Sequence, residues 1–215
     1  MPEELYAERH PSLFGRLKSM WPLKLFLTVA LDAVFWAFYL YLSRHPFFPV
    51  HGLPSLRLDL WAGFRPRPWT VIYESIYILV AAVPWLITAR DELRRYVTGF
   101  LWLSAVSFAV FAAFPVASPR PADLGDNPLL ILITQFDGPL NAFPSLHAGS
   151  LVYTLCLARR LFGGRWHPVV PIGLLVWGGL ILFGTLATKQ HYVLDLVAGG
   201  VLGLAADRFA WRKCS

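Results

Sequence analysis

Residues 22–42 read PLKLFLTVALDAVFWAFYLYL, and this run decides the class of fold. Its charged residues are Lys24 and Asp32. A helix needs about 20 mostly apolar residues to cross the hydrocarbon core of a bilayer. The run is too long for the apolar part of a cleavable signal peptide, and the residues before it include acids, which such a peptide avoids. We therefore predict a membrane-spanning helix here.

Five further apolar runs predict that the same arrangement continues along the chain. They cover residues 70–89, 96–117, 144–161, 168–187 and 191–210. Of the 215 residues, 56% are hydrophobic and 15% are charged, whereas a soluble domain carries about 25% charged residues. These features predict an all-α integral membrane bundle of six transmembrane helices, forming a single domain over residues 1–215.

Two segments between the runs differ from them. Residues 55–64 alternate polar and apolar side chains, which predicts an amphipathic segment on the membrane surface. Residues 129–136 form an apolar run too short to cross a bilayer, so we expect a re-entrant or interfacial segment. Gly199 and Gly203 lie about one helical turn apart, which favours close packing inside the bundle over a dimer seam.

The distribution of Lys and Arg predicts the orientation of the bundle. With six spans, both chain ends and two loops share one side of the membrane, and that side holds 13 of the 19 Lys and Arg residues. By the positive-inside rule this side is cytoplasmic, in the inner (plasma) membrane. The net charge of +6 comes from short basic groups between apolar runs, so no nucleic acid partner is expected. The opposite side holds Arg44, Arg57, Arg65, Arg67, Arg120 and Lys189.

Three polar groups of residues meet on that less basic side, although they are far apart in sequence. The first follows the third apolar run, and the other two begin the fourth and sixth runs. The topology therefore gives an independent reason to expect one site. Its members are Arg120 in the first group, Ser145 and His147 in the second, and Lys189, His191 and Asp195 in the third.

The first four of these suit the binding and cleavage of a phosphate ester. Arg120 and Lys189 supply positive charge for phosphate oxygens. Pro144 fits the first turn of a helix, whose free N–H groups and dipole would favour an anion beside Ser145. His147 can donate a proton to a leaving oxygen.

The third group predicts a nucleophile. His191 and Asp195 are four residues apart and so lie on one face of a helix. An aspartate bonded to one imidazole nitrogen fixes the tautomer and leaves the other nitrogen free to attack. No metal-ligand cluster is visible in the sequence, so neither a metal nor a cofactor is expected.

These blocks resemble the type 2 phosphatidic acid phosphatases, a superfamily that also includes the vanadium haloperoxidases. The family pattern is Lys-x6-Arg-Pro, Pro-Ser-x-His and Ser-Arg-x5-His-x3-Asp. Arg120-Pro121 matches the end of the first block, residues 144–147 match the whole second block, and His191 and Asp195 match the end of the third. The residues around them look most similar to the branch that contains the inositol phosphorylceramide synthases.

The resemblance implies a membrane enzyme that acts on a phospholipid or a polyprenyl phosphate at the extracytoplasmic face. In such an enzyme His191 attacks phosphorus and forms a phosphohistidine, and Asp195 orients His191. His147 protonates the leaving alcohol and later deprotonates water or an acceptor hydroxyl. The phosphate oxygens would be held by Ser145, Arg120 and Lys189.

Two cations of the family pattern are missing. The Lys of the first block would fall at Ala113, and the Ser-Arg of the third would fall at Gly184-Thr185. Because fixed cations stabilise the transition state of phosphoryl transfer, we hypothesise that Lys189 replaces the missing Arg. The alternative is an ordinary lysine whose stem lies along the apolar surface at a helix end.

Several alternatives stay open from the sequence. We favour a lipid phosphatase, because water is always available as an acceptor at the outer face. Transfer of a phospho-headgroup to another lipid is the first alternative, and a non-enzymatic transporter or scaffold is the second. Arg65, Arg67 and Glu74 are candidate headgroup contacts. Asp32 is either a functional residue or part of a helix–helix hydrogen bond.

Overall fold

The computed structural model describes residues 12–162 and 169–212, and within these ranges the regular elements are all helices. The expected all-α class is confirmed. Pro168, where the fifth run was expected to begin, lies outside the described residues, as do Arg9, Arg165 and Lys213 of the charge distribution.

Five of the six apolar runs form single helices close to the expected boundaries. The second run differs, because it is divided at Ser75 into two shorter helices, α5 (Pro66–Glu74) and α6 (Ile76–Trp85). The five single helices are α3 (Trp21–Leu42), α7 (Arg90–Ala113), α9 (Leu146–Phe162), α10 (Val169–Ala187) and α11 (Val193–Ala210).

Three short helices complete the described chain. α4 (Arg57–Ala62) lies in the segment expected to be amphipathic, and α8 (Pro128–Phe136) in the segment expected to be interfacial. α2 (Leu13–Lys18) precedes α3. The sequence therefore located every described helix that positions the candidate site, although it did not anticipate the break between α5 and α6.

In the part of the chain that the structure describes, length and composition identify three helices that could cross a membrane, namely α3, α7 and α10. α9 has 17 residues and rises only about 26 Å at 1.5 Å per residue. α11 has 18 residues but carries Asp195, Asp207 and Arg208. The finding supports membrane association through three apolar helices. That the chain crosses the membrane six times remains a proposal.

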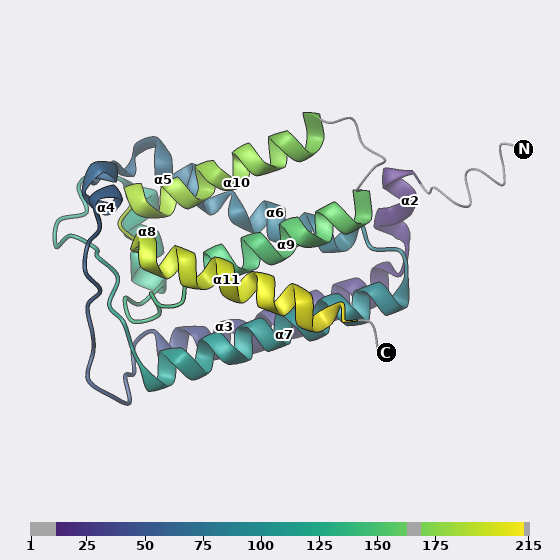
Figure 1. Cartoon of the computed structure of the whole chain (residues 1–215), viewed down its shortest axis with the longest axis horizontal. Helices are drawn as coiled ribbons and strands as arrows, with labels where there is room; N and C mark the ends of the chain where they lie inside the picture. The colour runs from purple at the N-terminus through teal and green to yellow at the C-terminus, as the bar shows by residue number, and fades with distance from the viewer. Residues whose placement is uncertain (1–11, 163–168, 213–215) are drawn as a thin grey trace, which may run out of the picture.

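The helices run side by side, and their ends fall into two groups (Figure 1). α4 and α8 lie at one end of the bundle, and α2 lies at the other. At the first end the Arg65 N–H donates to the Ala187 carbonyl at 2.8 Å. At the second end the Arg16 guanidinium donates to the Leu86 carbonyl at 3.3 Å. We call the first end, with α4 and α8, the site end.

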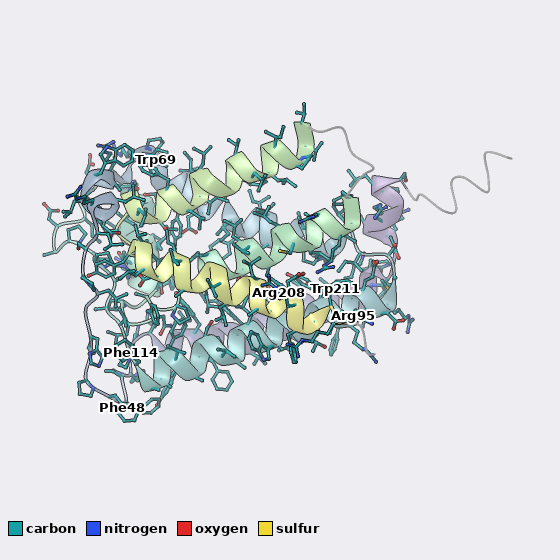
Figure 2. All side chains as sticks on the ribbon, in the orientation of Figure 1. Phe48, Trp69, Arg95, Phe114, Arg208 and Trp211 are labelled. Atoms are coloured by element: carbon teal, nitrogen blue, oxygen red, sulfur yellow. The ribbon has the colours of Figure 1, made fainter. Side chains whose placement is uncertain are left out.

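Side chains that suit a membrane boundary lie toward both ends (Figure 2). Phe48, Trp69 and Phe114 lie at the site end, while Arg95 and Trp211 lie toward the other. Between the ends, large apolar side chains on the outer faces are exposed, as lipid contact requires. They include Phe26, Val29, Ile172, Leu175, Val197 and Val201.

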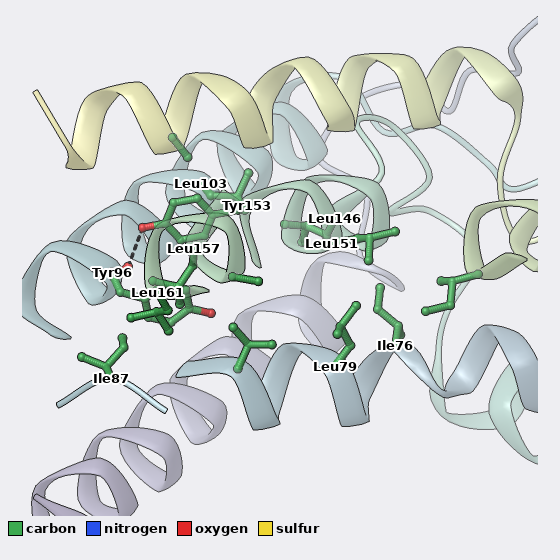
Figure 3. Packing of buried hydrophobic residues seen from close by; sticks show 14 of the residues in the cluster. Ile76, Leu79, Ile87, Tyr96, Leu103, Leu146, Leu151, Tyr153, Leu157 and Leu161 are labelled. Atoms are coloured by element: carbon green, nitrogen blue, oxygen red, sulfur yellow. Dashed lines mark hydrogen bonds between the residues drawn. The ribbon is translucent and has the colours of Figure 1, made fainter. Parts of the chain in front are cut away.

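α9 is the central helix, and it contacts α6, α7, α10 and α11. Its buried Leu146, Leu151 and Leu157 belong to one apolar cluster with side chains of the neighbouring helices (Figure 3). The Tyr153 hydroxyl donates to the Tyr96 carbonyl at 2.9 Å and so joins α9 to α7 (Figure 3). These contacts fix α9, whose first turn carries His147.

Glycines allow α11 to approach α9 closely. A Cβ atom on Gly199 would overlap the carbonyl oxygen of Ser145, and one on Gly203 would overlap the carbonyl oxygen of Gly149. The prediction that this pair packs inside the bundle is confirmed. Only a residue without a side chain lets the start of α11 lie against the start of α9.

We expect Gly203→Ala to lower the melting temperature of the detergent-solubilised protein. The added methyl must push two helix backbones apart, and overpacking of this kind costs about 1–3 kcal/mol. Gly179→Ala is the matched control, because a Cβ there meets nothing within 4 Å. Alanine is also the better helix former, so the control should melt at or slightly above the wild-type temperature. A Gly203→Ala protein that melts like its control would contradict the close packing.

Candidate active site

His191 lies in the short connection between α10 and α11, and it is only 4% exposed. The connection turns through Lys189, which has a positive φ of 57°. The N–H groups of Gln190 and His191 donate back to the Thr185 carbonyl at 2.9 and 3.4 Å. This turn directs the His191 imidazole into the bundle.

The hydrogen bonds of His191 determine which of its nitrogens is available. Nδ1 lies 3.1 Å from the Ala142 carbonyl oxygen and 3.4 Å from Asp195 Oδ2. A carbonyl oxygen can only accept, so Nδ1 carries the hydrogen of the neutral imidazole. Nε2 then holds a lone pair, and it lies 3.1 Å from Nδ1 of His147. The structure thus brings together the two histidines and the aspartate expected from the sequence. The expectation that His191 and Asp195 share one helical face is wrong, because α11 begins at Val193 and His191 lies in the connection before it.

Asp195 also joins the starts of two helices. It is fully buried, and its Oδ2 accepts from the Tyr192 N–H at 2.7 Å in the first turn of α11. Its carbonyl accepts from the Ser145 N–H at 3.0 Å. One residue therefore fixes the imidazole of His191 and the first turn of α9.

Ser145 precedes α9 as its N-terminal cap. α9 begins at Leu146, so the expectation that Pro144 lies in the first helical turn is wrong. The Ser145 hydroxyl accepts from the Ala148 N–H at 3.2 Å, which is how a capping serine satisfies a free helix N–H. The hydroxyl keeps its own proton for a further bond.

Arg120 is paired with a residue that the sequence did not indicate. Its two terminal nitrogens donate to the carbonyl and the carboxylate of Asp137, at 2.6 and 2.8 Å. Both side chains are largely buried, at 12% and 15% exposed. The remaining Nε–H of Arg120 is buried and has no hydrogen-bond partner among the described residues. No motif marked Asp137, since it follows α8 in an irregular connection.

Lys189 contacts α4. Its ammonium donates to the Asp59 carbonyl at 2.6 Å. The Asp59 carboxylate accepts from the N–H groups of Val193 and Leu56, at 2.8 and 2.7 Å. Burial lowers the pKa of the Lys189 ammonium, and the nearby Asp59 carboxylate partly opposes this by raising it. Asp59, the single acid of the amphipathic segment, thus fastens α4 to the turn that carries His191.

The three candidate headgroup contacts lie in different settings. Arg65 and Arg67 are exposed, and Arg67 pairs with the exposed Asp126 at 3.4 Å. Glu74 ends α5, and its Oε1 is buried without a partner in the described part of the chain. Of these three residues, Glu74 alone has a buried polar atom, Oε1, without a hydrogen-bond partner among the described residues.

Unsatisfied buried polar atoms gather at the site end. Buried polar groups are normally hydrogen-bonded, so a local group without partners calls for an explanation. A polar ligand entering this region would supply their partners. Within residues 12–162 and 169–212, those at the site end belong to Glu74, Ser118, Arg120, Asp137, Asn141, Gln190 and Asp195. The others lie on α7 and α9 and after α11, and belong to Ser104, Ser107, Thr154 and Trp211.

An apolar cleft of about 280 Å³ leads from His147 along the bundle, between α3, α6, α7 and α9. One face of α3 lines it at helical spacing from Lys24 to Tyr39, a length of about 22 Å. At the far end the buried Lys24 ammonium donates to the carbonyls of Arg16 and Trp85, at 2.9 and 2.6 Å. Asp32 lies midway along the cleft wall.

Comparisons with known proteins show the family to which the chain belongs. The sequence pattern of the PAP2 superfamily matches residues 64–208. An inositol phosphorylceramide synthase from Candida albicans is 23% identical over 170 residues, which cover 68% of this chain and 35% of that protein. The crystal structure of LpxE from Aquifex aeolicus superposes with a TM-score of 0.50 at 15% identity, covering 83% of this chain and 92% of the other. The last likeness concerns the fold alone.

We expect Asp59→Ala to loosen the turn at residues 188–192. The substitution removes two hydrogen bonds, a loss of about 1–3 kcal/mol. Amide hydrogen exchange across residues 188–195 should then be about 10-fold faster. Asp123→Ala is the control, because this exposed aspartate bonds only within its own loop, to the Gly125 N–H at 2.8 Å. Unchanged exchange in Asp59→Ala would refute the role given to Asp59.

Proposed function

Because the chain belongs to the PAP2 superfamily, we propose that it is a membrane enzyme that cleaves a phosphate ester of a lipid by hydrolysis. One observation carries the proposal. The Nε2 lone pair of His191 faces Nδ1 of His147 at 3.1 Å, so a nucleophile and a proton donor converge on one point. A phosphate that enters the site would replace this hydrogen bond, so that phosphorus meets Nε2 of His191 and the leaving oxygen meets Nδ1–H of His147.

The reaction would proceed in two steps. In the first, Nε2 of His191 attacks phosphorus, the bond to the leaving alcohol oxygen breaks, and Nδ1–H of His147 protonates that oxygen. In the second, Nδ1 of His147 takes a proton from water, and the hydroxide displaces the phosphoryl group from His191. Asp195 and the Ala142 carbonyl stabilise the positive charge that develops on the His191 ring, because both accept from Nδ1–H.

Three groups would hold the phosphate oxygens. Arg120 offers its unused Nε–H, and Ser145 offers its hydroxyl proton. Lys189 has three N–H donors, and the carbonyl of Asp59 accounts for one of them. Lys189 is thereby a proposed replacement for the missing family arginine. Arg65, Arg67 and Glu74 are proposed contacts for the rest of the headgroup.

The cleft supports a lipid as the substrate. It begins at His147, its walls are mostly apolar, and its length of about 22 Å along α3 suits a hydrocarbon chain. A phosphate held at the histidines would leave its apolar chain in the cleft. Phospholipids and polyprenyl phosphates both have this form.

We further propose the inner (plasma) membrane as the location, with six crossings, cytoplasmic termini and an extracytoplasmic site. The basic residues support this orientation, since Arg16, Arg95, Arg160 and Arg208 lie on segments away from the site end. α5 and α6 together would form the second crossing.

Transfer to another lipid is the second candidate. The similarity to an inositol phosphorylceramide synthase favours it, although the match covers about a third (35%) of that protein's length. Water or a lipid hydroxyl, once deprotonated by His147, could accept the phosphoryl group from His191. The two reactions give different products from a labelled substrate. Hydrolysis releases free phosphate, whereas transfer places the labelled phospho-headgroup on an added lipid alcohol.

We expect His191→Ala to abolish turnover of a lipid phosphate, because it removes the proposed nucleophile. His147→Ala should lower turnover of the lipid phosphate about 10²–10⁴-fold, the usual size of acid–base catalysis. It should keep the initial burst with p-nitrophenyl phosphate, whose leaving group needs no proton.

The matched control is His45→Ala, which removes an exposed imidazole bonded to its own helix at Tyr41. Its turnover should stay at the wild-type level. Substantial lipid turnover by His191→Ala, with the protein folded, would sink the proposed mechanism.

A further inference from the structure

Tyr73 belongs to none of the sequence blocks, yet it contacts the proposed proton donor. It lies on α5 and is 1% exposed. Its hydroxyl oxygen is 3.0 Å from Nε2 of His147, and the two rings lie 4.9 Å apart. The four groups Tyr73, His147, His191 and Ala142 therefore form one continuous line of hydrogen bonds.

The direction of every bond in this line follows from its last member. The Ala142 carbonyl can only accept, so Nδ1 of His191 donates and Nε2 accepts. Nδ1 of His147 must then donate to His191, and in the neutral imidazole Nε2 of His147 must accept. Tyr73 is therefore the donor to Nε2 while His147 is neutral.

The chemistry requires the reverse bond at another stage. To protonate the leaving oxygen and end neutral, His147 must first carry hydrogens on both nitrogens. The Nδ1–H bond then breaks, an O–H bond forms on the alcohol, and Nε2 keeps its hydrogen. During this step Nε2–H needs an acceptor, and the Tyr73 oxygen at 3.0 Å can serve as one. A hydroxyl can both donate and accept, whereas a carboxylate only accepts and an ammonium only donates.

Close packing holds Tyr73 in this place. A Cβ on Gly184 of α10 would lie 3.2 Å from Tyr73 Cβ and 3.3 Å from Tyr73 N, so the two helices are in tight contact there. Gly184 stands where the related family pattern has its Ser, next to the missing Arg. In this chain α5 packs directly against Gly184.

We propose that Tyr73 is a positioning residue for His147. Its hydroxyl keeps Nδ1 of His147 directed at the reacting groups in both protonation states by changing from donor to acceptor at Nε2. This inference rests on the proposed function. It assigns to α5, which lies outside the catalytic blocks, a direct part in the acid and base steps.

Other titratable or charged groups also face His147. Tyr77 of α6 lies with its ring 6.3 Å away, and His191 lies 5.3 Å away, ring to ring. Arg120 acts on His147 through its charge. None of these is removed by a substitution at Tyr73, so a change in pH dependence there reports on the Tyr73 hydroxyl.

Tyr73→Phe tests the proposal, because it removes the hydroxyl and keeps the ring. Phosphoryl transfer from a lipid phosphate, measured in a single turnover, should fall about 10-fold or more, since a buried charged group loses its partner. The alkaline limb of the pH–rate profile should move down by about one pH unit. Loss of the Tyr73 hydroxyl destabilises the doubly protonated imidazole of His147 more than the neutral one. The nitrophenolate burst from p-nitrophenyl phosphate should stay within about threefold of wild type.

Tyr153→Phe is the matched control, a tyrosine equally buried whose hydroxyl bonds to the Tyr96 carbonyl at 2.9 Å. It should shift the melting temperature without moving the pH profile or the dependence on leaving group. If Tyr73→Phe does not fold, 3-fluorotyrosine at position 73 keeps the shape and weakens the acceptor, and it should move the same limb in the same direction.

The outcomes are separable. A wild-type protein without turnover of any lipid phosphate refutes the proposed function. An active wild-type protein whose folded Tyr73→Phe variant has the same pH profile and the same dependence on leaving group as Tyr153→Phe refutes the role of Tyr73 alone.

Discussion

The contact between Nδ1 of His147 and Nε2 of His191, at 3.1 Å, is the interaction on which the rest of the site depends. The two residues are 44 positions apart, with His147 in the first turn of α9 and His191 in the connection before α11. They meet because α11 crosses α9 with Gly199 against the Ser145 carbonyl, and because Asp195 binds the first turn of α9 through its own carbonyl. A methyl group at that crossing would separate the donor from the nucleophile.

This constraint explains why a largely apolar bundle keeps so many polar atoms at one end. Burying hydroxyls, amides and ionised groups costs free energy unless each finds a partner. Asp195, Arg120 and Asp59 find most of theirs in backbone groups of neighbouring segments, which fixes those segments to one another. Among the described residues, most of the buried side-chain atoms that remain unpaired belong to residues at the site end, where we propose that a phosphate binds.

The sequence predicted the fold to the extent that local pattern determines it. Apolar runs of about 20 residues predicted five long helices, although α7 begins at Arg90 and not at Tyr96. The second run failed as a single helix, because nothing in its composition marks the break at Ser75 between α5 and α6. The start of α9 was placed at Pro144, two residues before its first residue Leu146, since proline also fits the residues just before a capping serine.

The site was predictable where spacing carries chemistry. His191 and Asp195 at one helical turn, and Pro-Ser-x-His, identified the residues that meet. Asp59, Asp137 and Tyr73 were missed, because each makes its contact through irregular chain or across helices, and no spacing rule links it to its partner. The sequence predicted Lys189 as a site residue, but it could not predict the bond from Lys189 to the Asp59 carbonyl, which depends on where α4 lies.

We propose that the nucleophile is Nε2 of His191. To test this, the solubilised protein is mixed with a lipid phosphate and quenched within one turnover at alkaline pH, and the phosphoryl group is located by mass spectrometry and phosphorus NMR. We expect a phosphoryl group on Nε2 of His191, because Nδ1 is bonded to Ala142 and Asp195. A phosphoryl group on Nδ1 or on another residue, or a burst of product without any phosphorylated protein, would contradict it.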